Sequence, residues 1–88
     1  MHVTIIQSEN CPLCKTAIHE LDDGVNTIEL HRDLADIADQ NRRTDMMTDL
    51  VLNGGDRNKR PLVFVNDYFM HWKPKDGDTP QCPNPEDT

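Results

Sequence analysis

Residues 3–14 read Val3-Thr4-Ile5-Ile6-Gln7-Ser8-Glu9-Asn10-Cys11-Pro12-Leu13-Cys14. The β-branched residues at the start predict a strand over 2–6, and Pro12 suits the first turn of a helix. The Cys-x-x-Cys pair therefore stands where a strand passes into a helix, with Cys11 at the helix N-terminus. There the backbone N–H groups and the helix dipole favour thiolate over thiol and lower the pKa of the thiol. Since the thiolate attacks in thiol–disulfide exchange, this placement indicates redox chemistry.

The hydrophobic pattern after the motif predicts a helix and a second strand. Apolar residues at Cys14, Ala17, Ile18 and Leu21 recur at helical spacing, so we expect a helix over 12–21. Residues 22–24 end it, with Gly24 as a left-handed C-cap. The alternation over residues 25–30 then predicts a strand.

A second helical region follows, and its pattern predicts two pieces. Leu34, Ile37 and Ala38 share one helical face, whereas Met47, Leu50 and Val51 share another that is out of register with it. We expect Asp33 to be the N-cap of the first piece and Thr44 that of the second, with a break near 43–44. Residues 53–55, Asn-Gly-Gly, end the region.

The most apolar run lies after a charged loop. Residues 61–65 predict a central strand, residues 66–67 a turn, and residues 68–72 a returning strand. The expected order is β-α-β-α-β-β. The first two strands pair in parallel through a right-handed crossover, and the last two form a hairpin. The fold class is therefore α/β, a four-stranded mixed sheet flanked by helices.

Size and composition limit the functional classes. Eighty-eight residues make one domain, and the net charge of −7 argues against a nucleic-acid or anionic-membrane surface. The sequence shows neither a signal peptide nor a run of about 20 apolar residues, so we expect a cytoplasmic protein. Three cysteines are a poor disulfide framework, which favours a catalytic or metal-binding role. We divide the chain into a domain over 1–72 and a Pro-rich acidic tail over 73–88.

In three features, residues 2–72 resemble a glutaredoxin of the thioredoxin-like fold. Cys11-Pro12-Leu13-Cys14 matches the C-P-x-C motif of that family, and Pro61 stands where the family has a cis-proline. The hairpin over 62–69 is similar to the V-F-I-x-x-x-x-I segment. The resemblance implies a thiol–disulfide oxidoreductase without a bound cofactor, acting as a monomer on protein or glutathione mixed disulfides. A ribonucleotide reductase is one conceivable substrate.

The chain departs from the family at four places. It has Lys59-Arg60 in place of Thr-Val, Met70-His71-Trp72 in place of a Gly-Gly pair, and no basic residue among 8–10. The terminal helix of the family is missing. These departures leave the electron donor open between glutathione and a reductase, and a phage-type redoxin fits about as well.

The resemblance and the helix-terminal placement together assign roles. Cys11, the more exposed thiol, attacks the substrate disulfide, and Cys14 resolves the mixed disulfide. Pro12 stiffens the turn. A cis Pro61 presents the backbone of Arg60 to an extended substrate. Lys59 and Arg60 either bind a carboxylate and lower the pKa of Cys11, or belong to a solvated loop.

Two other functions stay open. The chain could be a binding module that acts through its tail and an open sheet face. Alternatively, Cys11 and Cys14 could hold zinc, although only Cys82 and four histidines remain as further ligands, and we assign no metal. Cys82 is either a third redox residue or an inert thiol. We expect His19 and His31 to be solvated, and Trp72 to cover apolar surface that the missing helix leaves.

Overall fold

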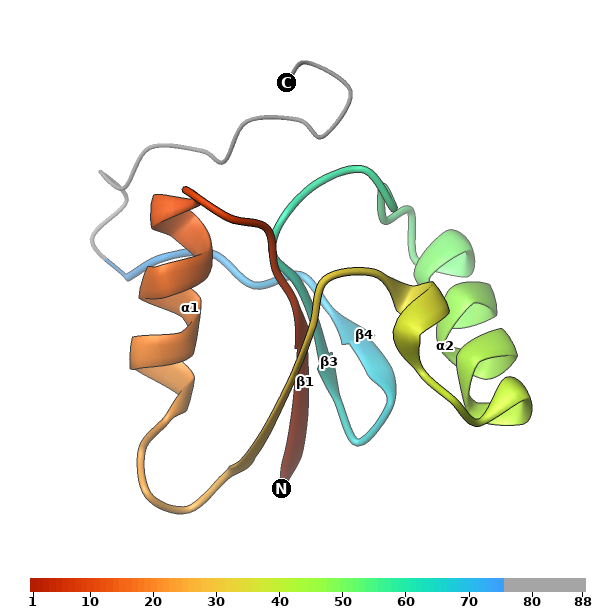
Figure 1. Cartoon of the computed structure of the whole chain (residues 1–88), viewed down its shortest axis with the longest axis horizontal. Helices are drawn as coiled ribbons and strands as arrows, with labels where there is room; N and C mark the ends of the chain where they lie inside the picture. The colour runs from red at the N-terminus through yellow and green to blue at the C-terminus, as the bar shows by residue number, and fades with distance from the viewer. Residues whose placement is uncertain (76–88) are drawn as a thin grey trace.

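The computed structural model describes residues 1–75 as a mixed α/β domain (Figure 1). Its elements are β1 (His2–Ile6), α1 (Pro12–Leu21), β2 (Thr27–His31), the 3₁₀ turn η1 (Leu34–Asp36), α2 (Gln40–Leu52), β3 (Leu62–Val65) and β4 (Tyr68–Met70). The sheet has the strand order β2-β1-β3-β4. β1 pairs with β2 in parallel and with β3 antiparallel, and β3 and β4 form the hairpin. The predicted element order and mixed sheet are confirmed.

The two faces of the sheet carry separate apolar clusters, because α1 covers one face and η1 with α2 the other (Figure 1). The α2-side cluster consists of Ile6, Leu34, Ile37, Met46, Leu50, Leu62 and Phe64, with Met47 and Phe69 packed against it. The α1-side cluster consists of Val3, Ile5 and Val63, with Ile18, Leu21, Ile28, Val65, Met70 and Trp72 packed against it. Trp72 thus covers apolar surface on the α1 side, as the sequence predicted.

The first helix has the predicted bounds, and the second strand does not. α1 runs from Pro12 to Leu21, and Asp22 is its C-cap. Gly24 has a positive φ of 83°, two residues beyond the cap. The strand predicted over 25–30 starts at Thr27 instead. The side chain of Asp23 explains the delay, since it accepts hydrogen bonds from the N–H groups of Val25 and Asn26 and holds both in a turn.

The second helical region breaks earlier than predicted. Asp33 is the N-cap of η1, as expected, but the N-cap of α2 is Asp39 and the predicted cap at Thr44 is wrong. Asp39 accepts hydrogen bonds from the N–H groups of Asn41 and Arg42, and such a bond starts a helix without an apolar residue nearby. The polar stretch after Asp39 therefore forms the first turns of α2.

Arg42 connects α2 to the sheet through a cluster of polar side chains. Its guanidinium donates to both carboxylate oxygens of Glu29 on β2, to the hydroxyl of the buried Thr4 on β1, and to Asp67 in the β3–β4 turn. His2 and His31 also contact Glu29. The expectation of a solvated His31 is therefore wrong, because its ring is half-buried against this carboxylate.

None of the helices within residues 1–75 is long and apolar enough to cross a bilayer.

Candidate redox site at the carboxyl end of β1

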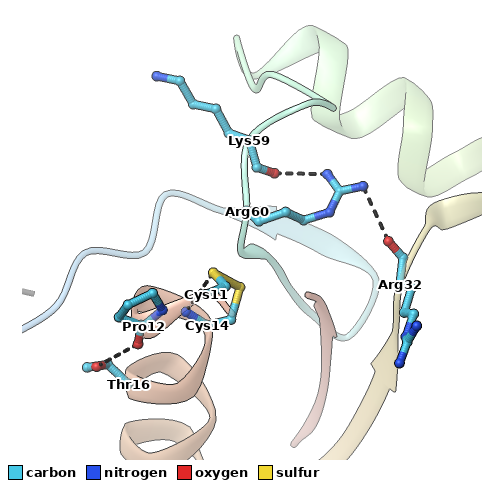
Figure 2. Close-up of a disulfide and its surroundings, with 7 residues drawn as sticks. All are labelled: Cys11, Pro12, Cys14, Thr16, Arg32, Lys59 and Arg60. Atoms are coloured by element: carbon cyan, nitrogen blue, oxygen red, sulfur yellow. Dashed lines mark hydrogen bonds between the residues drawn. A yellow bond between two sulfur atoms is a disulfide. The ribbon is translucent and has the colours of Figure 1, made fainter. Parts of the chain in front are cut away.

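Three segments meet at the end of the sheet where β1 stops. Ile6, the last residue of β1, is paired with His31 on β2 and with Leu62 on β3. The loop that leads to Cys11, the segment that begins at Arg32, and the segment that ends at Pro61 therefore converge there. Figure 2 shows the result, with the two cysteines at the start of α1.

Cys11 and Cys14 form a disulfide, which brings together the predicted catalytic pair. Their Cα atoms are 5.2 Å apart, inside the range of about 4.4–6.8 Å that disulfides span. Cys11 is the N-cap of α1, with extended backbone, and its sulfur accepts the N–H of Cys14 at 3.2 Å. The first turn of α1 contains no acidic residue. A negative charge on this sulfur would therefore face backbone N–H groups and the positive end of a helix dipole.

The expected exposure of Cys11 is wrong. Cys11 and Cys14 are each only 1% exposed in the disulfide-bonded state. The reason lies in the cap geometry: the Cys11 side chain folds back over the first turn to bond with Cys14. Cys14 in turn lies on the buried face of α1 together with Ala17. A helix-terminal position alone did not reveal this inward direction.

Pro12 and Pro61 have the local backbone features that were expected of them. Pro12 is the first residue of α1, and it is exposed beside the disulfide. Its carbonyl accepts a hydrogen bond from the hydroxyl of Thr16 (Figure 2). The peptide bond between Arg60 and Pro61 is cis, as expected. The substrate-binding roles of Pro12, Arg60 and Pro61 stay predictions.

The side chain of Arg60 is fixed by backbone carbonyls. Its guanidinium donates to the carbonyls of Arg57 at 2.6 Å, Lys59 at 3.0 Å and Arg32 at 3.3 Å. It extends toward Arg32, whereas the side chain of Lys59 points away from the disulfide (Figure 2). Burial lowers the pKa of the Arg60 guanidinium. Arg60 thus ties the segment before β3 to the segment after β2.

A pocket of about 330 Å³ lies beside the disulfide, on the β2 side of the β1–α1 loop. It is lined by Gln7, Ser8, Glu9, Asn10, Cys14, Lys15 and Arg32, and we call it the β1–α1 pocket. Arg32 forms an ion pair with Glu9 at 2.7 Å between their side chains. The hydroxyl oxygen of Ser8 is buried without a hydrogen-bond partner.

The sequence reasoning missed Lys15 and Arg32 as residues of this site. The parallel pairing predicted for the first two strands was enough to place Arg32 at this site, since parallel strands end at the same edge of a sheet.

Within residues 1–75 no group of three or more His, Cys, Asp or Glu side chains could hold a metal ion. Cys82, which the sequence offered as a zinc ligand or third redox residue, lies outside the described residues.

The comparisons with known proteins supply no relative. No protein-family profile matches the chain, and neither a curated protein nor a solved structure is significantly similar to it. The fold and the site define a small α/β domain with a Cys-x-x-Cys disulfide at a strand-to-helix junction, an arrangement compatible with a thioredoxin-like fold.

Proposed function

We propose that this protein is a dithiol–disulfide oxidoreductase similar to glutaredoxins and thioredoxins. The observation that carries the proposal is the position of Cys11 as the N-cap of α1, disulfide-bonded to Cys14 one turn further on. A sulfur that already accepts a backbone N–H at a helix N-terminus is well placed to carry negative charge. The 5.2 Å separation of the two Cα atoms lets the pair close and open with little backbone movement.

The reaction proceeds by two exchanges of thiolate for disulfide. In the reduced protein, the Cys11 thiolate attacks one sulfur of a substrate disulfide. The other substrate sulfur leaves as a thiolate and takes a proton from water. The Cys14 thiolate then attacks the Cys11 sulfur, closes the Cys11–Cys14 bond and releases the second substrate thiol. Two electrons pass to the substrate, and glutathione or a reductase returns them to the protein.

Substrate approach follows from the residues around the pair. Pro12 is exposed beside the disulfide and the segment of Arg60 runs opposite it (Figure 2), which supports an extended peptide lying between them. Since both cysteines are buried when oxidised, the proposal requires that the Cys11 sulfur turns outward once its bond to Cys14 is broken.

Turnover of a protein disulfide by single-cysteine variants tests the proposal. Cys11→Ser removes the attacking sulfur and should abolish turnover. Cys14→Ser keeps the attack but removes the resolving thiol, so a mixed disulfide between Cys11 and the substrate should accumulate and be seen by mass. Cys82→Ser is the matched control and should retain turnover. Full activity of the Cys11→Ser variant would end the proposal.

The burial of both cysteines favours a second candidate, a binding module in which the disulfide only stabilises the fold. A structural disulfide typically has a reduction potential below about −300 mV, and exchange-active pairs lie above that value. Equilibration of the protein with glutathione and thioredoxin redox buffers, followed by alkylation and mass measurement, separates the two candidates.

A further inference from the structure

Two side-chain polar atoms in the described part of the chain are buried without a hydrogen-bond partner, and both belong to segments that surround the disulfide. They are the hydroxyl oxygen of Ser8, which lines the β1–α1 pocket, and Nε of Arg60, whose guanidinium reaches the carbonyl of Arg32. A buried donor without an acceptor is unfavourable, and such groups mark places where an absent molecule supplies the partner. Nε of Arg60 can only donate, and the Ser8 hydroxyl can donate as well as accept, so an acceptor would satisfy either group.

Charge is also distributed unevenly toward this end of the sheet. The three converging segments, residues 7–15, 32–36 and 56–61, carry five of the nine Lys and Arg residues of the chain. They carry only four of its 16 Asp and Glu residues. The chain as a whole has a net charge of −7, so the neighbourhood of the disulfide is locally positive on an acidic protein. Such a distribution attracts negatively charged ligands to one end of the molecule.

Arg32 already holds a carboxylate at the edge of the pocket. Glu9 lies 2.7 Å from its guanidinium, and both side chains are about 70% exposed, at 71% and 72%. An ion pair this exposed contributes little stability and is easily exchanged for another carboxylate. Glu9 therefore occupies the position that a ligand carboxylate would take, with Lys15 as a second cation of the same pocket.

We infer that the β1–α1 pocket receives an Asp or Glu side chain of the substrate, so that the protein disulfides reduced here are flanked by acidic residues. The inference rests on the proposed oxidoreductase function. The incoming carboxylate displaces Glu9 from Arg32 and, when the β1–α1 loop shifts to uncover the buried Ser8 hydroxyl, accepts its hydrogen. Cys14 lines the same pocket and is bonded to Cys11, so this contact holds the substrate near the attacking sulfur.

Single-turnover reduction of matched peptides tests the inference. One peptide has an internal disulfide flanked by Glu, and the other has Gln at the same positions, both with blocked termini. The reduced protein should reduce the Glu peptide roughly three- to tenfold faster, and added NaCl should shrink this ratio. Arg32→Gln and Ser8→Ala should each lower the rate on the Glu peptide and spare the Gln peptide. Glu9→Gln, which frees Arg32, should increase the preference.

Lys75→Gln is the charge-matched control, because Lys75 donates its backbone N–H to Glu20 of α1 and does not line the β1–α1 pocket. This variant should keep the preference. Equal rates on the two peptides would overturn the inference, and so would a preference for the Glu peptide that survives both Arg32→Gln and Ser8→Ala. Neither result would contradict the proposed oxidoreductase function. A preference for glutathionylated peptide regardless of flanking charge would also overturn it and assign the pocket to glutathione. If neither peptide is reduced, the proposed function itself is wrong, and the inference falls with it.

Discussion

Arg42 on α2 holds Glu29 on β2 through two parallel hydrogen bonds, with N–O distances of 2.9 and 3.1 Å. The same guanidinium reaches the hydroxyl of Thr4 at 3.0 Å, on a strand residue that is fully buried. A planar guanidinium suits this arrangement because its donors match both carboxylate oxygens at once. The pair therefore fixes the position of α2 against the β1–β2 half of the sheet, away from the disulfide.

The first prediction concerns acid stability. The hydrogen bond from Arg42, aided by those from His31 and His2, lowers the pKa of Glu29 from 4.5 to about 2. Because the folded-state pKa is depressed, the contribution of Glu29 to stability is fully present above pH 4.5 and is lost as the pH falls toward 2. It amounts to at most roughly 3 kcal/mol. Urea unfolding followed by circular dichroism should show a smaller loss over that pH interval for Glu29→Gln than for the wild type.

Asp45→Asn, on the exposed side of α2, is the control for the acid-stability prediction. It should show the same pH dependence as the wild type. An identical acid response of the Glu29→Gln variant and the wild type would contradict the assignment to Glu29.

The second prediction concerns the loss of Arg42. Arg42→Met leaves Glu29 half-buried without its main partner, so we expect a loss of about 2–4 kcal/mol in the free energy of unfolding. The double variant with Glu29→Gln should recover part of this loss, because no unpaired charge then remains. Arg43→Met is the neighbouring control: it removes one hydrogen bond to the carbonyl of Ile37 and should cost only about 1 kcal/mol. Additive losses in the double variant would contradict the coupling.

The third prediction concerns access to the two thiols. In the oxidised protein Cys11 and Cys14 are joined in a disulfide, so neither should react with iodoacetamide. After reduction, Cys11 should be alkylated first, since it caps the helix and Cys14 stays on the buried face of α1. Peptide mapping by mass spectrometry gives the order. Alkylation of Cys14 ahead of Cys11 would reverse the roles assigned to the pair.

The fourth prediction separates an oxidoreductase from a module that acts through its tail. A chain that ends at residue 75 retains every element described above, including Trp72 on the α1-side cluster. It should reduce a protein disulfide at the rate of the full-length chain. The matching comparison is a full-length chain with Cys82→Ser, which separates the loss of the tail from the loss of its thiol. A collapse of activity in the shortened chain would favour the binding module.

Local patterns predicted the elements whose stabilising contacts are themselves local. The helix over 12–21 was found because its apolar spacing and Pro12 act within one segment. The turn at 66–67 was found for the same reason: both residues adopt positive φ, at 51° and 69°, which Asn and Asp tolerate. The candidate pair Cys11 and Cys14 could likewise be predicted, because the motif and its helix are contiguous.

Features that depend on distant partners were not predictable from the pattern. The start of α2 was misplaced because the cap at Asp39 carries no apolar signal, and because Arg42 in the first turn bonds to Glu29 thirteen residues earlier in the chain. The contact of His31 with Glu29 is different, because the two residues are two positions apart on β2 and the strand period puts them on one face. The β1–α1 pocket depends on segments that meet only after the sheet has formed.

The single tryptophan of the chain gives the fold a built-in optical reporter. Trp72 packs against the same apolar cluster as Ile18 and Leu21 of α1, the helix that carries Cys14. We therefore expect its fluorescence emission to change when the packing of α1 against the sheet changes. The rates at which the Cys11–Cys14 disulfide is reduced and formed again can therefore be followed by tryptophan fluorescence, without an attached dye.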